Sequence, residues 1–298
     1  MRKIMIAFLG ATYVGLTSIA AAAEPFPAKV VNMIVPYAPG GTTDLLARLL
    51  AQKLSEKYNE QVIVQNKTGA GGNIAASFVA RSEADGYTIM MASIGQFAIN
   101  PLIFSSPGYS AAKDFTAVAA IAEVPNLLIA PSSSKIDSFQ SLLKAAKADS
   151  GNLAFASSGN GSSNHLAGVL LSQMAGIELM HVPYKGSAPG LHALYGGDVQ
   201  IMFDNLSSAL PHVKSGRLRA LASTSAARFP QLPDVPTIAE SGLPGYEASA
   251  WFGIVAPAGT PSAVVEKLNK NINEILNEPA ISKQLADIGM TPSGRSAA

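Results

Sequence analysis

The amino-acid sequence predicts an α/β fold of two doubly wound lobes joined by crossing strands. Three observations support this prediction. From Val30 to Ala92, apolar runs rich in β-branched residues alternate with segments of helical periodicity, and the alternation starts again after Val118. This order is typical of a parallel sheet that is covered by helices on both faces. The chain of 298 residues is also at the upper limit for a single hydrophobic core.

The first half is predicted to follow the order β-α-β-α-β. Strands are expected at 30–35, 62–64 and 88–92, and helices at 44–57 and 73–81. The first helix should begin at an N-cap residue, Thr42 or Thr43, and bury one leucine face. The leucines at helical spacing are Leu45, Leu46, Leu49, Leu50 and Leu54.

The second half repeats the alternation with more elements. Strands are expected at 127–130, 153–156, 180–182, 201–203, 218–222 and 254–256, and helices at 139–148, 166–174, 188–195 and 264–276. Residues 229–245 are rich in Pro and Gly, which predicts an irregular surface connection. We place lobe one at 24–124 with 252–298 and lobe two at 125–251, so the chain should cross near 123–126 and return near 250–253.

The N-terminus has the pattern of a cleavable secretory signal. Arg2 and Lys3 form a positive region, 4–16 is apolar, and the small residues from Ala20 to Ala23 precede Glu24. A membrane anchor is the alternative, but the apolar stretch is shorter than the ~20 residues that a spanning helix needs. We therefore expect export, with cleavage after Ala23.

Composition removes several classes of function. The chain has 21 Lys and Arg against 20 Asp and Glu, so it offers no basic face for nucleic acid. The absence of Cys excludes disulfides, thiolate zinc sites and cysteine nucleophiles. The four His residues are scattered and form no HExxH motif. We expect no metal, no cofactor and no nucleic-acid partner.

Four predicted strand-to-helix connections share one construction, two in each half. They span 36–44, 69–73, 157–165 and 183–187, and each places Gly and small hydroxyl residues where a helix begins. Glycine lets a ligand approach the main chain, and the first N–H groups of a helix attract an anion. In open α/β sheets such loops gather at the carboxyl ends of the strands. Plain turn chemistry is the alternative for each loop alone, but four matched loops predict one shared cleft.

Other readings of these loops were weighed. None fits a nucleotide-binding signature. A hydrolase would use Ser162, His165 and Asp204, but Ser162 lies outside a GxSxG elbow, and His165 is close enough along the chain to serve in capping.

Four residues near the loops keep two readings each. Lys185 is expected either to pair with a ligand carboxylate or to remain solvated. Asp44 is expected to have either a functional or a structural role, and the structural role leads because the helix dipole favours a carboxylate in the first turn. Trp251 and Phe252 are expected to pack between the lobes, or else to touch a ligand.

Five motifs in order resemble the Bug/TctC family, the extracytoplasmic solute receptors of tripartite tricarboxylate transporters. The motifs are 35–44, 69–73, 85–88, 161–166 and 182–186, and the similarity covers nearly all of the chain after residue 23. The resemblance implies a type II periplasmic binding protein, a monomer with two lobes that close over a carboxylate as a Venus flytrap does. It implies a periplasmic location, no catalysis, and delivery to a two-subunit membrane permease. A receptor that feeds a membrane sensor is the alternative, with an exported hydrolase third.

The resemblance and the loop pattern together give the expected site. Its residues are Ala38, Pro39, Gly40, Gly41, Thr42, Gly69, Ala70, Gly71, Gly72, Asn73, Ser157, Ser158, Gly159, Asn160, Gly161, Ser162, Ser163, His165, Tyr184 and Asp204. The family pattern also continues for another helix after the motif at 289–292, whereas this chain ends at Ala298. That departure predicts an uncovered apolar face on lobe one.

Overall fold

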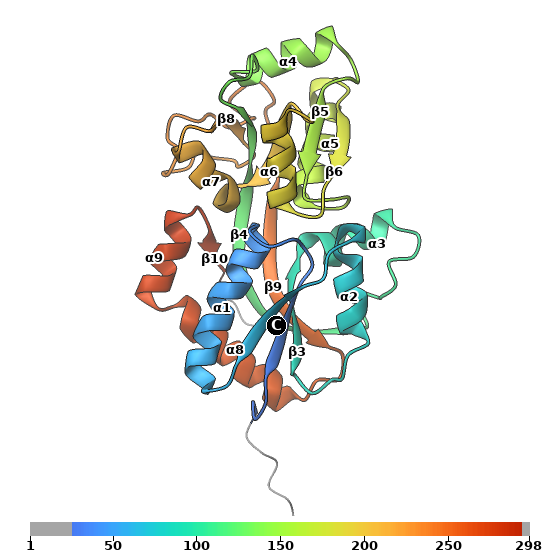
Figure 1. The fold of residues 1–298 in the computed structure, drawn as a ribbon, viewed down its shortest axis with the longest axis vertical. Coiled ribbons are helices and arrows are strands. Elements are labelled where there is room, and N and C mark those ends of the chain that lie inside the picture. The colour runs from blue at the N-terminus through green and yellow to red at the C-terminus, as the bar shows by residue number, and fades with distance from the viewer. Residues whose placement is uncertain (1–25, 294–298) are drawn as a thin grey trace, which may run out of the picture.

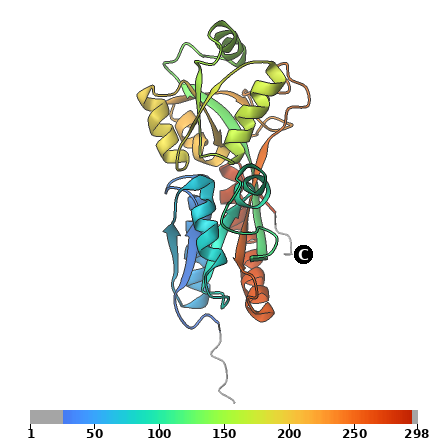
Figure 2. The same cartoon turned by 90° about the vertical axis from the view of Figure 1, so that its right-hand side faces the viewer.

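The computed structural model describes residues 26–293 and consists of two α/β lobes, one above the other (Figures 1 and 2). The predicted signal segment and its cleavage point lie outside the described residues. Ten strands form one continuous hydrogen-bonded arrangement, with the main order β2-β1-β3-β9-β4-β7-β5-β6 and with β8 and β10 pairing to β4. The α/β class predicted from the sequence is confirmed.

Lobe one contains the predicted parallel strands. These are β1 (Val31–Val35), β2 (Val62–Asn66) and β3 (Thr88–Ser93), with β1 in the middle. On one face lie α1 (Thr42–Tyr58) and α8 (Ser262–Leu276), and on the other α2 (Asn73–Ala80). Successive side chains of β1 point to opposite faces of the sheet, so Met33 packs with α1 and Ile34 packs with α2. Such alternation follows from the pleat of a strand and gives the lobe two apolar layers.

Lobe two repeats this arrangement. The parallel strands are β5 (Ala154–Ser157), β6 (Met180–Pro183) and β7 (Ile201–Asn205), and β8 (Leu218–Ser223) pairs with β4. One face is covered by α6 (Ser187–Gly196) and α7 (Leu206–Lys214), the other by α4 (Phe139–Ala148) and α5 (Ser163–Ala175). The predicted irregular connection at 229–245 is confirmed, because no helix or extended strand forms there.

Two long antiparallel strands join the lobes. They are β4 (Phe115–Pro131) and β9 (Ser249–Pro257), which run between the two lobes in Figure 1. Their pairing extends from Phe115 opposite Pro257 to Pro125 opposite Ser249. From Asn126 onward β4 pairs with β7 and β8 of lobe two instead. The changeover lies where the sequence predicted the chain to cross.

The structure corrects the predicted start of α1. Its N-cap is Gly41, without a side-chain capping bond, not Thr42 or Thr43. The hydroxyl of Thr42 is instead 2.7 Å from that of Ser207 in lobe two. The predicted leucine face is also partly wrong, since Leu45 is 40% exposed although Leu46 and Leu50 are buried.

Several short elements were not predicted. They are α7, the π-helical turn η2 (Gly95–Ile99), the 3-10 turn η1 (Ala70–Gly72), α3 (Asn100–Ile103), α9 (Pro279–Asp287) and β10 (Thr291–Pro292). Most are too short for a periodic pattern, and α7 contains Pro211. A hollow beside β9 and β10 is lined in part by Phe97, Ala119, Trp251 and Ile254. None of the helices within 26–293 is long and apolar enough to cross a membrane.

Close packing of α5 on β5 depends on Gly168. Its Cα lies so near the Phe155 ring that a Cβ at this position would overlap the ring carbons. Gly168 is a buried residue of α5, and Phe155 belongs to the apolar layer beneath this helix and is 2% exposed. Lobe two therefore has little room for even one added methyl group at this position.

We predict that Gly168→Ala lowers the free energy of unfolding by about 1–3 kcal/mol, because overpacking forces side chains from their preferred rotamers. Gly196→Ala is the matched control, since Gly196 is also helical and its added methyl would meet no heavy atom nearer than 3.7 Å. It should leave stability unchanged or raise it by about 0.4–1 kcal/mol. Urea unfolding of both variants measures this, and equal effects would contradict the packing argument.

Candidate ligand-binding cleft

A cleft between the lobes gathers the beginnings of four helices. The N-cap or first residue of α1, α5, α6 and α7 lines it, namely Gly41, Ser162, Ser187 and Asn205. Each helix follows a strand that ends at the cleft, so the carboxyl edges of both sheets face the same space. Free N–H groups and helix dipoles at four such ends favour a negatively charged group.

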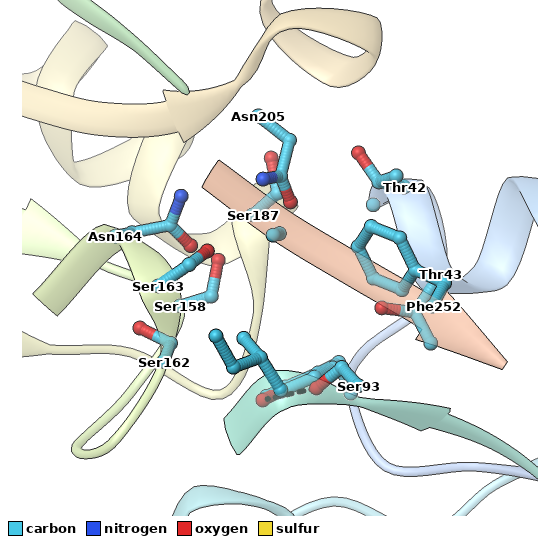
Figure 3. A pocket seen from close by; sticks show the side chains of 14 residues that line it. Thr42, Thr43, Ser93, Ser158, Ser162, Ser163, Asn164, Ser187, Asn205 and Phe252 are labelled. Atoms are coloured by element: carbon cyan, nitrogen blue, oxygen red, sulfur yellow. Dashed lines mark hydrogen bonds between the residues drawn. The ribbon is translucent and has the colours of Figure 1, made fainter. Parts of the chain in front are cut away.

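The lining of the cleft is uncharged and combines polar with apolar side chains. The cleft is lined by Tyr37, Gly41, Thr42, Thr43, Ser93, Ile94, Ser158, Ser162, Ser163, Asn164, Ser187, Asn205, Ala250 and Phe252. The hydroxyls of Thr43, Ser158 and Ser163 hold no hydrogen-bond partner among the described residues. Figure 3 shows Ser158 and Ser163 on one side of the cleft and Thr43 on the other. These three hydroxyls are free to donate to a ligand.

The wall from lobe one is fixed by a buried network. Gln96 Nε2 donates to Tyr37 Oη at 3.0 Å and to the Gly71 carbonyl at 3.0 Å, and Ser93 Oγ donates to Gln96 Oε1 at 2.9 Å. Burial raises the pKa of Tyr37, so its phenol stays protonated. Gln96 thus ties the loop after β1 to the glycine-rich loop before α2.

The wall from lobe two is organised by three asparagines. Asn126 Oδ1 accepts from Asn164 Nδ2 at 2.7 Å and from Asn205 Nδ2 at 2.8 Å. Asn126 lies on β4 at the changeover between the lobes, whereas Asn164 and Asn205 begin α5 and α7. The crossing strand therefore sets the positions of two of the four helix ends.

Asp204 lies directly behind this wall. It is fully buried, and its carboxylate accepts from Ser187 Oγ at 2.6 Å, Ser208 Oγ at 2.8 Å and the Asn205 N–H at 2.9 Å. Burial raises the pKa of Asp204 to about 6, although these hydrogen bonds partly offset the effect. The carboxylate acts on the cleft through Ser187, because Asp204 itself does not line it.

The lobes touch at the edges of the cleft. The Ala38 N–H donates to the Lys185 carbonyl at 2.8 Å, and Thr42 Oγ1 is 2.7 Å from Ser207 Oγ. Two close approaches involve glycine: a Cβ at Gly41 would lie 3.3 Å from Ser187 Cβ, and one at Gly186 would lie 2.9 Å from the Ala38 nitrogen. The structure thus represents a closed arrangement of the two lobes.

The structure brings many of the expected residues together. Gly41, Thr42, Ser158, Ser162 and Ser163 line the cleft described above. A neighbouring pocket is lined by Gly69, Ala70, Gly71, Gly72, Ser158, Gly159, Asn160, Tyr184 and Lys185, and Tyr37 and Ser158 border both spaces.

Other expected residues lie beside the two spaces. Pro39 and Gly40 are exposed at the rim next to Ala38, and Asn73 accepts from Asn100 Nδ2 at 2.6 Å in lobe one. In lobe two, Ser157 Oγ lies 2.6 Å from His181 Nε2, and the Gly161 N–H donates to His165 Nδ1 at 3.3 Å. Of these, Asn73 and Ser157 are engaged with the protein itself.

Sequence reasoning missed nine lining residues. They are Tyr37, Thr43, Ser93, Ile94, Asn164, Ser187, Asn205, Ala250 and Phe252. Four of these lie within or beside the glycine-rich loops and could have been included from position alone. Ser93 ends β3 and Asn205 ends β7, so the rule that sites lie at the carboxyl ends of strands would have found them. Phe252 had been considered as either interlobe packing or a ligand contact.

The three residues considered for a hydrolase do not form a triad. Ser162 Oγ accepts from the backbone N–H of His165 at 3.1 Å, which is a helix cap, and His165 Nδ1 accepts from Gly161. Asp204 interacts with Ser187, Ser208 and Asn205 instead. No group of His, Asp and Glu within 26–293 has the arrangement of a metal site.

Comparison with known proteins places the chain in a family. Residues 46–298 match the family model for the tripartite tricarboxylate transporter family receptor. The chain is 38% identical over 291 residues to BugT of Bordetella pertussis, covering 97% of this chain and 89% of BugT. It is 41% identical over 272 residues to a UPF0065 protein encoded between tcbD and tcbE in Pseudomonas sp., covering 91% and 81%.

Solved structures agree with this placement. An R. palustris protein solved with adipate superposes with a TM-score of 0.89 at 43% identity, covering 92% of this chain and 91% of the other. MatC from Rhodopseudomonas palustris, solved with bound malate, superposes with a TM-score of 0.85 at 34% identity, covering 89% and 90%. The chain therefore belongs to the tripartite tricarboxylate transporter receptor family, the periplasmic solute-binding receptors of the Bug/TctC type.

Proposed function

We propose that this protein captures a small carboxylate-bearing molecule between its lobes and delivers it to a two-subunit membrane permease. One observation carries the proposal: four helix N-termini and three free hydroxyls converge on a cleft whose lining holds no charged side chain within the described part of the chain. A carboxylate satisfies such donors without a cation, because each N–H or O–H donates to an anionic oxygen. The similar R. palustris proteins solved with adipate and with malate support this ligand class.

The remaining parts of the proposal follow from the same reading. Lobe one comprises 24–124 with 252–298 and lobe two 125–251, and the mature chain begins at Glu24 and acts as a monomer. The ligand is bordered by the expected loop residues, with Thr43, Ser93, Ser187, Asn205 and Phe252 added from the cleft lining. Closure proceeds by a hinge in β4 and β9, since these strands connect the lobes.

We predict that the mature protein binds one class of organic acid with micromolar or tighter affinity and does not bind the matching amides. Removing the negative charge removes the group that the helix ends attract. Isothermal titration calorimetry on residues 24–298, after unfolding and refolding to strip bound ligand, measures this. The panel pairs adipate, malate, a tricarboxylate and an aromatic acid with their amides. Equal affinity for an acid and its amide would contradict the carboxylate proposal.

We predict that Thr43→Val weakens binding of the preferred acid by about 10- to 100-fold, which corresponds to the loss of one hydrogen bond to a charged group. Thr43 lies in the first turn of α1, lines the cleft and is almost fully buried. The shape of the side chain is kept, so the effect reports the hydroxyl. The control is Thr116→Val, near the start of β4 and remote from the cleft, which should leave the dissociation constant unchanged. Unaltered binding by Thr43→Val would remove this hydroxyl from the site.

A further inference from the structure

A buried carboxylate without a cation stands directly behind the proposed anion site. Asp204 is held by two serine hydroxyls and one backbone N–H, all of them neutral donors. Ser187 lies between Asp204 and the cleft, since it donates to Asp204 Oδ2 at 2.6 Å and also lines the cleft. One hydroxyl group thus separates the place of a ligand from an ionisable group.

The direction of the Ser187 hydrogen bond determines whether Ser187 presents a donor or an acceptor to the cleft. A serine hydroxyl has one hydrogen, and an ionised Asp204 is an acceptor with no hydrogen to donate. While Asp204 is ionised, Ser187 gives its hydrogen to Asp204 and turns its lone pairs toward the cleft. An incoming carboxylate then meets an acceptor where it needs a donor, and a second negative charge lies just behind it.

We propose that Asp204 takes up one proton from solution when a carboxylate ligand enters the cleft. This inference rests on the proposed function. One O–H bond forms on Asp204 Oδ2, and no other covalent bond changes. The neutral acid donates its hydrogen to Ser187 Oγ, and the Ser187 hydrogen turns to the ligand. The proton is acquired before the lobes close, because Asp204 is fully buried in the closed arrangement.

The raised pKa of Asp204 allows this uptake of a proton near neutral pH. Burial has already raised the pKa of Asp204 to about 6, so the free protein is mostly ionised at pH 7 but close to the transition. A nearby anion raises the pKa of a carboxyl group further. The ligand-bound protein then holds a proton on Asp204 at pH 7, whereas the free protein mostly does not.

Other titratable groups on the surrounding elements do not account for this pKa. The elements packed against β7 are β4, β5, α5, α6 and α7. They carry Glu123, His165, His192, Tyr195, His212 and Lys214, and α1 across the cleft carries Asp44 and Arg48. None of them contributes to the raised pKa of Asp204. Asp44 is engaged with Arg48 at 2.9 Å and with the Gly40 N–H at 3.0 Å.

The test is calorimetric titration of the wild type with adipate at pH 7 in buffers of different ionisation enthalpy. The slope of the observed enthalpy against the buffer enthalpy gives the number of protons taken up. We expect a value approaching one proton per ligand, falling toward zero at pH 5, where Asp204 is already protonated. Affinity should rise as the pH falls from 8 to 6, approaching about tenfold per pH unit. Malate serves as the second probe.

Two variants identify the group that takes up the proton. Asp204→Asn mimics the protonated acid, so it should bind without proton uptake and with an affinity that no longer changes between pH 8 and 6. His165→Gln removes a second titratable side chain near the cleft, whose pKa burial lowers. Whatever its effect on affinity, this variant should retain the full proton uptake.

The outcomes separate the two proposals. Binding of adipate or malate by the wild type without proton uptake would overturn the role of Asp204 and leave the receptor function standing. Uptake that persists in Asp204→Asn or disappears in His165→Gln would also overturn it. Failure of every acid in the panel to bind the folded protein would overturn the proposed function, and the inference with it.

Discussion

The antiparallel pairing of β4 with β9 is the constraint on which the rest of the structure depends. It holds from Phe115 to Pro125, and β4 then continues into lobe two to pair with β7 and β8. Each lobe has three parallel strands, and the helices that line the cleft begin at the carboxyl edge of these strands. Because both sheets are built onto the same pair of crossing strands, the two edges face each other. A local rule of α/β folds, applied twice, thereby creates one cleft with helix ends on both sides.

Recognition by neutral groups gives this cleft its character. Backbone N–H groups and hydroxyls replace the water around an anion without the desolvation penalty of a buried Lys or Arg. Close behind the lining in lobe two is the carboxylate of Asp204, which has the same sign as the proposed ligand. Selectivity then depends on the number and direction of donors, and a single serine hydrogen changes that count. Because backbone groups carry much of the recognition, few side chains in the sequence indicate which ligand is bound.

Much of the fold could be predicted because its signals are local. Helix α4 was predicted at its observed bounds, and the glycine-rich loops were found because turns require particular residues. The start of α1 was wrong for a non-local reason. Thr42 has the chemistry of an N-cap, but its hydroxyl is used by Ser207, which lies 165 residues away. The place of Phe252 in the site is non-local in the same way, since no sequence window shows that β9 pairs with the end of β3 beside the loops of lobe two.

Asp204 also connects the cleft to the contact between the lobes. Thr42 Oγ1 of lobe one is 2.7 Å from Ser207 Oγ and donates to Ser208 Oγ at 3.5 Å, and Ser208 donates to Asp204 at 2.8 Å. An ionised Asp204 therefore orients the Ser208 hydrogen inward and leaves its lone pairs for Thr42. In this proposal the Asp204 carboxyl group decides whether Ser187 can donate its hydrogen to the ligand. The same carboxyl group also orients the Ser208 hydroxyl, which contacts Thr42 of lobe one. The carboxyl end of β7 therefore links the charge of the ligand, the protonation of Asp204 and the closure of the lobes. The link exists because α6 and α7 each contribute one serine to the Asp204 carboxylate.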